Sequence, residues 1–177
     1  KLIPNVFTAS FFATTDEKQN QIASFYTGAM AYARTLSFTD LTQPVDLTII
    51  SPNDPEAMNK YPAECKALGI PYIYDPSQQI VRTDPVILRE GVQDADILIV
   101  NDYEFELLKD HTGMDDDDIR EAVKQAVIIT LGADGALIWA EEKIKVPAVT
   151  PKQILDPTGV GDAFRAGLIK GIALGLP

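Results

Sequence analysis

Short, unbroken apolar segments alternate with helical patterns through the middle of the chain, and this alternation constrains the fold more than any other feature. The segments LTII (47–50), ILIV (97–100) and VIIT (127–130) contain strand formers with almost no polar interruption. Strands that are covered on both faces have this pattern, as in parallel sheets flanked by helices. The order strand, helix, strand, helix therefore predicts an α/β layered fold with a mostly parallel central sheet.

The predicted elements continue in this pattern toward the end of the chain. Strands are predicted at 45–52, 70–77, 95–101, 126–132, 135–140 and 142–149. Helices are predicted at 53–69, 84–92, 102–113 and 115–125, and after a glycine turn at 159–161. Asn53 is expected to cap the first of these helices, because its side chain can accept a bond from a free backbone amide. No linker divides the chain, so we predict one domain over residues 1–177.

The N-terminal segment has a different pattern. Residues 5–15 and 20–27 are rich in β-branched and aromatic residues, and the polar turn DEKQ lies between them. This predicts a β-hairpin or two neighbouring strands, followed by a short helix at 28–38. An exposed hairpin serves equally well as a lid or as a contact in a homodimer, and the sequence leaves both open.

Charge and composition exclude several classes of partner. The formal net charge is -11, which argues against nucleic acid or an anionic membrane as the main partner. Cys65 is the single cysteine, so no intramolecular disulfide can form, and we predict a cytoplasmic protein. The chain opens in strand-like sequence without an initiator methionine and closes as a helix finishes, so we expect a fragment of a longer polypeptide.

Polar or glycine-rich residues follow three of the predicted strand regions. Asn101 and Glu104 follow ILIV, the turn TLGADG (130–135) follows VIIT, and the segment GVGD (159–162) follows the last strand. Ligands of open α/β sheets bind beyond the carboxyl ends of the strands. We therefore expect these three segments to lie at one edge of the sheet.

Each segment has a functional and a purely structural interpretation. Asn101 and Glu104 lie on one helix face and could hold a hydrated Mg²⁺, or they could simply cap that helix. The turn TLGADG could contact a nucleotide or could only join two strands. Asp162 could be a helix N-cap, or an acid beside phosphate-binding amides that takes a proton from an attacking hydroxyl. Taken together, the three segments fit phosphoryl transfer from a metal-bound nucleotide.

Other nucleotide motifs are absent from the sequence. There is no G-x-x-x-x-G-K-[ST] motif of a P-loop enzyme, and no G-x-G-x-x-G after the first predicted strand. An oxidoreductase with a dinucleotide site is therefore poorly supported. The single histidine, His111, lies near a helix end, and no cluster of cysteine and histidine predicts a zinc site.

The segment DPTGVGDAFRAG (156–167) resembles the C-terminal signature of the ribokinase/PfkB family of carbohydrate and nucleoside kinases. NDYE resembles the N-x-x-E motif of that family, and TLGADG resembles its nucleotide-binding turn. Longer stretches, such as SPNDPEAMNKYPAECKALGIPYIYDPSQQ, resemble its bacterial and archaeal adenosine (nucleoside) kinase branch. The resemblance implies a ribokinase-like three-layer αβα fold in which the N-terminal strands belong to a lid.

The resemblance also implies a role for each matching residue. Asp162 matches the catalytic base, and the amides of Gly159, Val160 and Gly161 match the anion hole that faces the transferred phosphoryl group. The remaining matches concern cofactors. Asn101 and Glu104 match the residues that organise Mg²⁺ and phosphate through water. Thr130, Gly132 and Gly135 match the ATP-binding turn, and Asp156 and Thr158 match positions that help hold a monovalent cation such as K⁺. Arg165, one turn into the helix, is expected to face the same region, where it contacts either phosphate or a surface acid.

The implied activity is ATP-dependent phosphorylation of a hydroxymethyl group on an adenosine-like nucleoside or on a sugar of the ribose or fructose type. A non-catalytic nucleotide- or sugar-binding protein on the same fold is the alternative from another class. The acid at position 162 argues against that alternative, because a protein that only binds its ligand needs no base there. The N-terminal and C-terminal parts of the family, which carry most acceptor contacts and complete the adenine pocket, have no match in this chain.

Overall fold

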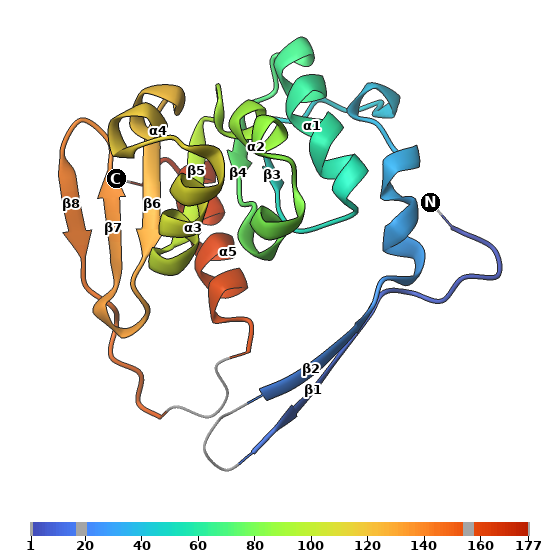
Figure 1. The fold of residues 1–177 in the computed structure, drawn as a ribbon, viewed down its shortest axis with the longest axis horizontal. Helices are drawn as coiled ribbons and strands as arrows, with labels where there is room; N and C mark the ends of the chain where they lie inside the picture. The colour runs from blue at the N-terminus through green and yellow to red at the C-terminus, as the bar shows by residue number, and fades with distance from the viewer. Residues whose placement is uncertain (1, 17–20, 154–157, 177) are drawn as a thin grey trace. The chain divides into compact units, whose positions relative to one another are not determined.

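A computed structural model describes residues 2–16, 21–153 and 158–176. The chain divides into two compact units, and each unit is described by itself. The first unit consists of Lys1–Phe12 and Ala23–Ala148, and the second consists of Ala13–Ile22 and Val149–Pro177. Within the described residues, the first unit contains the central sheet and four α-helices, and the second contains one α-helix near the C-terminus (Figure 1).

The central sheet has six strands in the order in which they occur in the chain (Figure 1). The strands are β3 (Thr48–Ile50), β4 (Tyr72–Tyr74), β5 (Ile97–Asn101), β6 (Ala126–Thr130), β7 (Ala136–Trp139) and β8 (Lys143–Val146). β3 to β6 pair in parallel, and β7 and β8 add an antiparallel edge. The prediction of a mostly parallel sheet is confirmed, although each strand is shorter than its predicted range.

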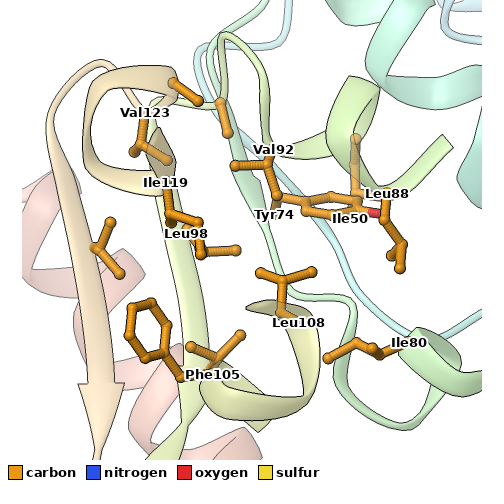
Figure 2. Packing of buried hydrophobic residues seen from close by; sticks show 14 of the residues in the cluster. Ile50, Tyr74, Ile80, Leu88, Val92, Leu98, Phe105, Leu108, Ile119 and Val123 are labelled. Atoms are coloured by element: carbon orange, nitrogen blue, oxygen red, sulfur yellow. The ribbon is translucent and has the colours of Figure 1, made fainter. Parts of the chain in front are cut away.

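Four α-helices connect the parallel strands: α1 (Pro55–Leu68), α2 (Pro85–Val92), α3 (Asp102–Thr112) and α4 (Asp116–Ala122). Because the strand order runs in one direction and such crossovers are right-handed, all four helices lie on the same face of the sheet. Between them and the sheet lies the main core, in which Tyr74, Leu98 and Phe105 are buried (Figure 2). Ile73 and Ile99, which point to the opposite face, are buried too, and this explains the unbroken apolar runs.

The start of α1 differs from the prediction that Asn53 caps it. The N-cap is Asp54, and Pro55 occupies the first helical position, where its fixed φ and missing N–H suit a helix start. The Asn53 side chain instead accepts a bond from the Asp54 amide at 2.8 Å. The Asp54 carboxylate makes no cap bond, because the Arg34 guanidinium pairs with both of its oxygens at 2.6 and 2.8 Å.

The N-terminal strands form a sheet of their own. β1 (Ser10–Thr15) and β2 (Gln21–Tyr26) make a two-stranded sheet, as the β-branched and aromatic residues predicted. The helix predicted at 28–38 is a 3-10 helix, η1 (Gly28–Thr35). The described residues that follow also form the 3-10 segments η2 (Phe38–Asp40), η3 (Ser77–Arg82) and η4 (Gly132–Asp134). A lid role for β1 and β2 stays a prediction.

The second unit contains α5 (Val160–Ala173), which begins two residues earlier than predicted, because only Gly159 of the predicted turn 159–161 lies outside the helix. Over the described residues, none of the helices has the length and apolar character that crossing a bilayer requires.

Candidate active site

The parallel strands bring several predicted site residues to one edge of the sheet. Asn101, the last residue of β5, is the register partner of Thr130, the last residue of β6. Ile50 and Tyr74, which end β3 and β4, are also register partners. The segments that follow these four strands therefore leave the sheet at the same edge, as expected from the sequence.

Asn101 and Glu104 form a capping box at the start of α3. The Asn101 side-chain oxygen accepts from the Glu104 amide at 2.7 Å, and the Glu104 Oε2 accepts from the Asn101 amide at 2.9 Å. Two backbone donors that a helix start leaves free are satisfied in this way. The structural interpretation of the NDYE segment is therefore confirmed. A functional role is compatible with it, because each carboxylate oxygen retains a second lone pair.

Polar side chains from the ends of β3 and β4 extend this edge, and sequence reasoning missed them. Asp75, which is buried, accepts a bond from the Ser51 hydroxyl at 2.9 Å. Ser77, at the start of η3, donates to Glu104 Oε1 at 3.0 Å. Both contacts join residues more than twenty positions apart, so no local pattern could reveal them. The one available signal was the stretch DPSQQ inside the family resemblance.

The turn TLGADG joins β6 to β7, and its two predicted glycines differ in their surroundings. Gly132 has φ 58°, and no described atom lies within 4 Å of the place where a Cβ would stand. Gly135 has φ 94°, and a Cβ there would lie 2.0 Å from the Val146 carbonyl oxygen. The fold therefore requires glycine at position 135, whereas Gly132 combines a turn conformation with open space beside it.

An open pocket of about 560 Å³ lies beside the start of α3 and the exit of β6. The apolar residues that line it include Leu131, Leu137 and Trp139. The Lys143 ammonium lies 3.7 Å from the centre of the Trp139 ring. Stacking of this kind holds a cation over an aromatic face. No feature of the sequence analysis pointed to this pocket.

The second unit contains the glycine turn and its acid. Gly159 is the N-cap of α5 with φ 77°, so Val160, Gly161 and Asp162 are the first three residues of the helix. The alternative that Asp162 is itself the N-cap is wrong, because the left-handed turn falls three residues earlier, at a glycine that tolerates it. The amides of the first helical turn have no helical acceptor and attract anions.

Arg165 lies one turn further along α5 and folds back toward the start of the helix. A Cβ at Gly161 would meet the Arg165 Nη1 at 2.6 Å. The guanidinium therefore covers Gly161, in agreement with the expectation that it faces the anion-binding region. A side chain at position 161 would force the guanidinium to move.

The structure places the predicted residues in two groups. Asn101, Glu104, Thr130, Gly132 and Gly135 lie along the edge of the sheet in the first unit. Gly159, Val160, Gly161 and Asp162 lie on α5 in the second unit, together with the exposed Thr158. Asp156, the other predicted ligand of a monovalent cation, lies outside the described residues.

The side chains that could act as ligands indicate how Mg²⁺ could be held. Within the described residues, no three His, Cys, Asp or Glu side chains come together as a metal cluster. Mg²⁺ is usually bound by one or two carboxylates, several waters and the phosphates of a nucleotide, so a preformed cage is not needed. Glu104, with a fixed carboxylate and one lone pair left on each oxygen, fits this mode of contact through water.

Comparison with known proteins identifies close relatives. A nucleoside kinase of Methanothermobacter thermautotrophicus is 29% identical over 180 residues, which cover 98% of this chain and 56% of that protein. The structure of Burkholderia thailandensis nucleoside kinase in complex with inosine matches with a TM-score of 0.94 at 36% identity, covering 100% of this chain and 58% of that one. Its complex with ADP-inosine matches with a TM-score of 0.89 at 37% identity over 97% and 53% of the two chains.

A third relative connects the chain to the ribokinase fold. Methanocaldococcus jannaschii nucleoside kinase, described as an archaeal member of the ribokinase family, matches with a TM-score of 0.88 at 28% identity, over 98% of this chain and 57% of that one. The predicted ribokinase-like αβα fold is thereby confirmed. The chain spans about half the length of these relatives. The model of the pfkB family carbohydrate kinases matches residues 4–177, and the chain belongs to that family.

Proposed function

We propose that this chain carries the phosphoryl-transfer residues of an ATP-dependent kinase whose acceptor is the hydroxymethyl group of a nucleoside. The observation that carries the proposal is the start of α5, where Asp162 lies in the first helical turn and follows Gly159 and Gly161 in the chain. An acid at this place lies beside the amides that attract a phosphate, and it can take a proton from a hydroxyl that attacks the phosphate.

The proposed reaction uses the residues as follows. Asp162 accepts the proton of the acceptor hydroxyl, whose oxygen then attacks the γ-phosphorus of ATP in line with the leaving ADP oxygen. The amides of Gly159, Val160 and Gly161 donate to the phosphoryl oxygens as charge develops on them. Arg165, which covers Gly161, adds a positive charge at the same end of α5.

The edge of the sheet supplies the second group of residues. Glu104 and Asn101 hold Mg²⁺ and the phosphates through water, and Thr130 and Gly132 lie where the sugar or phosphates of ATP can approach. When bound, Mg²⁺ neutralises charge on the phosphates. A K⁺ ion near Asp156 and Thr158, a lid formed by β1 and β2, a homodimer and a cytoplasmic location stay predictions from the sequence.

A nucleoside is favoured over a simple sugar as acceptor. Two relatives that cover 98% and 91% of this chain are named nucleoside kinases, and a third nucleoside kinase was solved with inosine and with ADP-inosine. A fructokinase of Escherichia coli is 31% identical over 90 residues, which cover 49% of this chain, so a sugar acceptor is the second candidate.

The test is release of ADP from MgATP by the full-length protein, with inosine, adenosine, cytidine, ribose and fructose as acceptors. Asp162→Asn should lower kcat by about 10² to 10⁴, the usual contribution of a general base, while ADP binding persists. Asp117→Asn is the matched control, because Asp117 is also an exposed acid in the first turn of a helix, α4, and it should leave kcat unchanged. Near-normal turnover in Asp162→Asn would remove Asp162 from the mechanism.

A further inference from the structure

We propose that Ser77 is a positioning residue that fixes the Glu104 carboxylate for its work with Mg²⁺ and phosphate. This inference rests on the proposed function, in which Glu104 takes part in phosphoryl transfer. It starts from two contacts, one on each carboxylate oxygen: Oε1 accepts from the Ser77 hydroxyl at 3.0 Å, and Oε2 accepts from the Asn101 amide at 2.9 Å.

The two donors belong to different elements and therefore fix the orientation of the Glu104 carboxylate plane. Asn101 ends β5, whereas Ser77 begins η3, twenty-seven positions before Glu104 in the chain. One bond to a carboxylate leaves it free to rotate about that bond, but two bonds from separate directions hold its orientation. Orientation matters here because Mg²⁺ demands near-ideal octahedral geometry, even when the contact passes through a water molecule.

The backbone of Ser77 supplies an independent argument. Over the described residues, three non-glycine residues have positive φ: Asn5 at 62°, Ser77 at 41° and Asp94 at 66°. Asn and Asp are the side chains that tolerate the left-handed region, and serine is not among them. Glycine at position 77 would remove the strain, so the serine there costs stability. Strain of this kind persists at sites where the side chain is needed.

The segment around Ser77 is held firmly enough to orient another group. The Asp75 amide donates to the Ile50 carbonyl at 2.9 Å, and the Gln79 side chain donates to the Asn53 carbonyl at 3.1 Å. The Ser77 hydroxyl also lies 3.1 Å from the Gln78 Oε1, but it has one hydrogen to donate. The charged Glu104 is the stronger acceptor, since bonds to a carboxylate are roughly twice as strong as neutral ones.

The test combines a binding measurement with kinetics on the full-length protein. Calorimetric titration with ADP at increasing MgCl₂ gives the Mg²⁺ concentration that half-saturates nucleotide binding. Ser77→Gly should raise this concentration and lower kcat by about tenfold, the lower end of losses for residues that orient metal contacts. The KM for inosine should not change. Because the backbone strain at position 77 is relieved, the melting temperature should stay the same or rise.

Three further variants separate the hydroxyl from the backbone. Asp94→Gly also places a glycine at a positive φ, at a residue outside the site, and should leave the Mg²⁺ requirement unchanged. Ser77→Thr keeps the hydroxyl and should restore that requirement, although its branched side chain should lower the melting temperature at positive φ. Ser77→Gly added to Glu104→Gln should have no further effect, because the two side chains act as one unit.

The outcomes distinguish this inference from the proposed function. An unchanged Mg²⁺ requirement in Ser77→Gly, or additive losses in the double variant, would overturn the role of Ser77 while leaving the kinase intact. If the parent protein released no ADP with any acceptor, the proposed function would fail. The calorimetric titration, which needs no acceptor, would still decide the role of Ser77, and ADP binding without Mg²⁺ dependence would overturn that role as well.

Discussion

Two capping boxes of nearly equal geometry occur among the described residues, and together they can separate the structural role of Asn101 from a functional one. In the first, Asn101 and Glu104 exchange bonds of 2.7 and 2.9 Å at the start of α3. In the second, Asp115 and Asp118 exchange bonds of 2.9 and 3.0 Å at the start of α4. The second box is an internal control, because the same local physics operates at a helix that carries no predicted site residue.

Removal of either cap should cost a similar amount of stability. Loss of an N-cap side chain usually costs about 1 kcal/mol, within a range of about 0.5–2 kcal/mol, so Asn101→Ala and Asp115→Ala should each lower the free energy of unfolding by that amount. Asn101→Asp keeps an acceptor oxygen at the cap. Its negative charge at a helix N-terminus is favourable by about 0.3–1 kcal/mol, so its stability should equal or slightly exceed that of the parent.

Activity should follow a different order. Asn101→Asp places a second carboxylate beside Glu104, where ATP phosphates are proposed to bind, so kcat should fall at least about tenfold despite an intact cap. Asp115→Ala should lose stability without losing kcat. Urea unfolding followed by circular dichroism gives the free energies, and ADP release with inosine gives kcat. Full activity in Asn101→Asp would refute the reasoning, because it would show that Asn101 only caps α3.

Two further predictions concern packing and pH. Gly91→Ala should destabilise the protein by about 1–3 kcal/mol in urea unfolding, because the new Cβ would lie 2.4 Å from the buried Tyr74 ring. Gly171→Ala in α5, with no described atom within 4 Å of its Cβ position, should instead stabilise the protein by about 0.5–1 kcal/mol. Equal effects of the two substitutions would contradict the packing of Gly91 against Tyr74. Burial raises the pKa of the Cys65 thiol to about 11, above its unfolded value. The folded state therefore favours the protonated thiol, and this preference contributes fully to the free energy of unfolding below about pH 8.5 and is lost as the pH rises to about 11. At pH 8 a thiol reagent should therefore react with Cys65 much more slowly in the folded protein than in guanidinium, and rapid reaction would show that the thiol is exposed.

The central sheet could be predicted from the sequence because its signal is local and repeated. The parallel strands β4, β5 and β6 are buried on both faces, so their apolar runs are unbroken, and the helices between them have their own caps and periodicity. The start of α5 was also readable, since glycine at a left-handed turn followed by helix-forming residues is a local pattern. These features depend on residues within about one turn of each other.

The details that failed depend on residues far apart in the chain. Asn53 has the chemistry of an N-cap, but the helix starts one residue later because Pro55 fixes its first position. Asp54 then gives its carboxylate to Arg34, twenty positions earlier, a contact that no pattern in the sequence indicates. The contact of Ser77 with Glu104 escaped prediction for the same reason.

Glu104 shows why sequence motifs and structural roles are hard to separate at the edge of this sheet. Its amide and carboxylate close the capping box of α3, and the same carboxylate is the group proposed to meet Mg²⁺ and phosphate. An alanine substitution removes both roles at once, so a loss of activity in Glu104→Ala would not reveal which role was lost. Glu104→Gln keeps a side-chain oxygen that can accept from Asn101 but lacks the charge, and loss of activity at unchanged stability in this variant would assign the charge to the reaction.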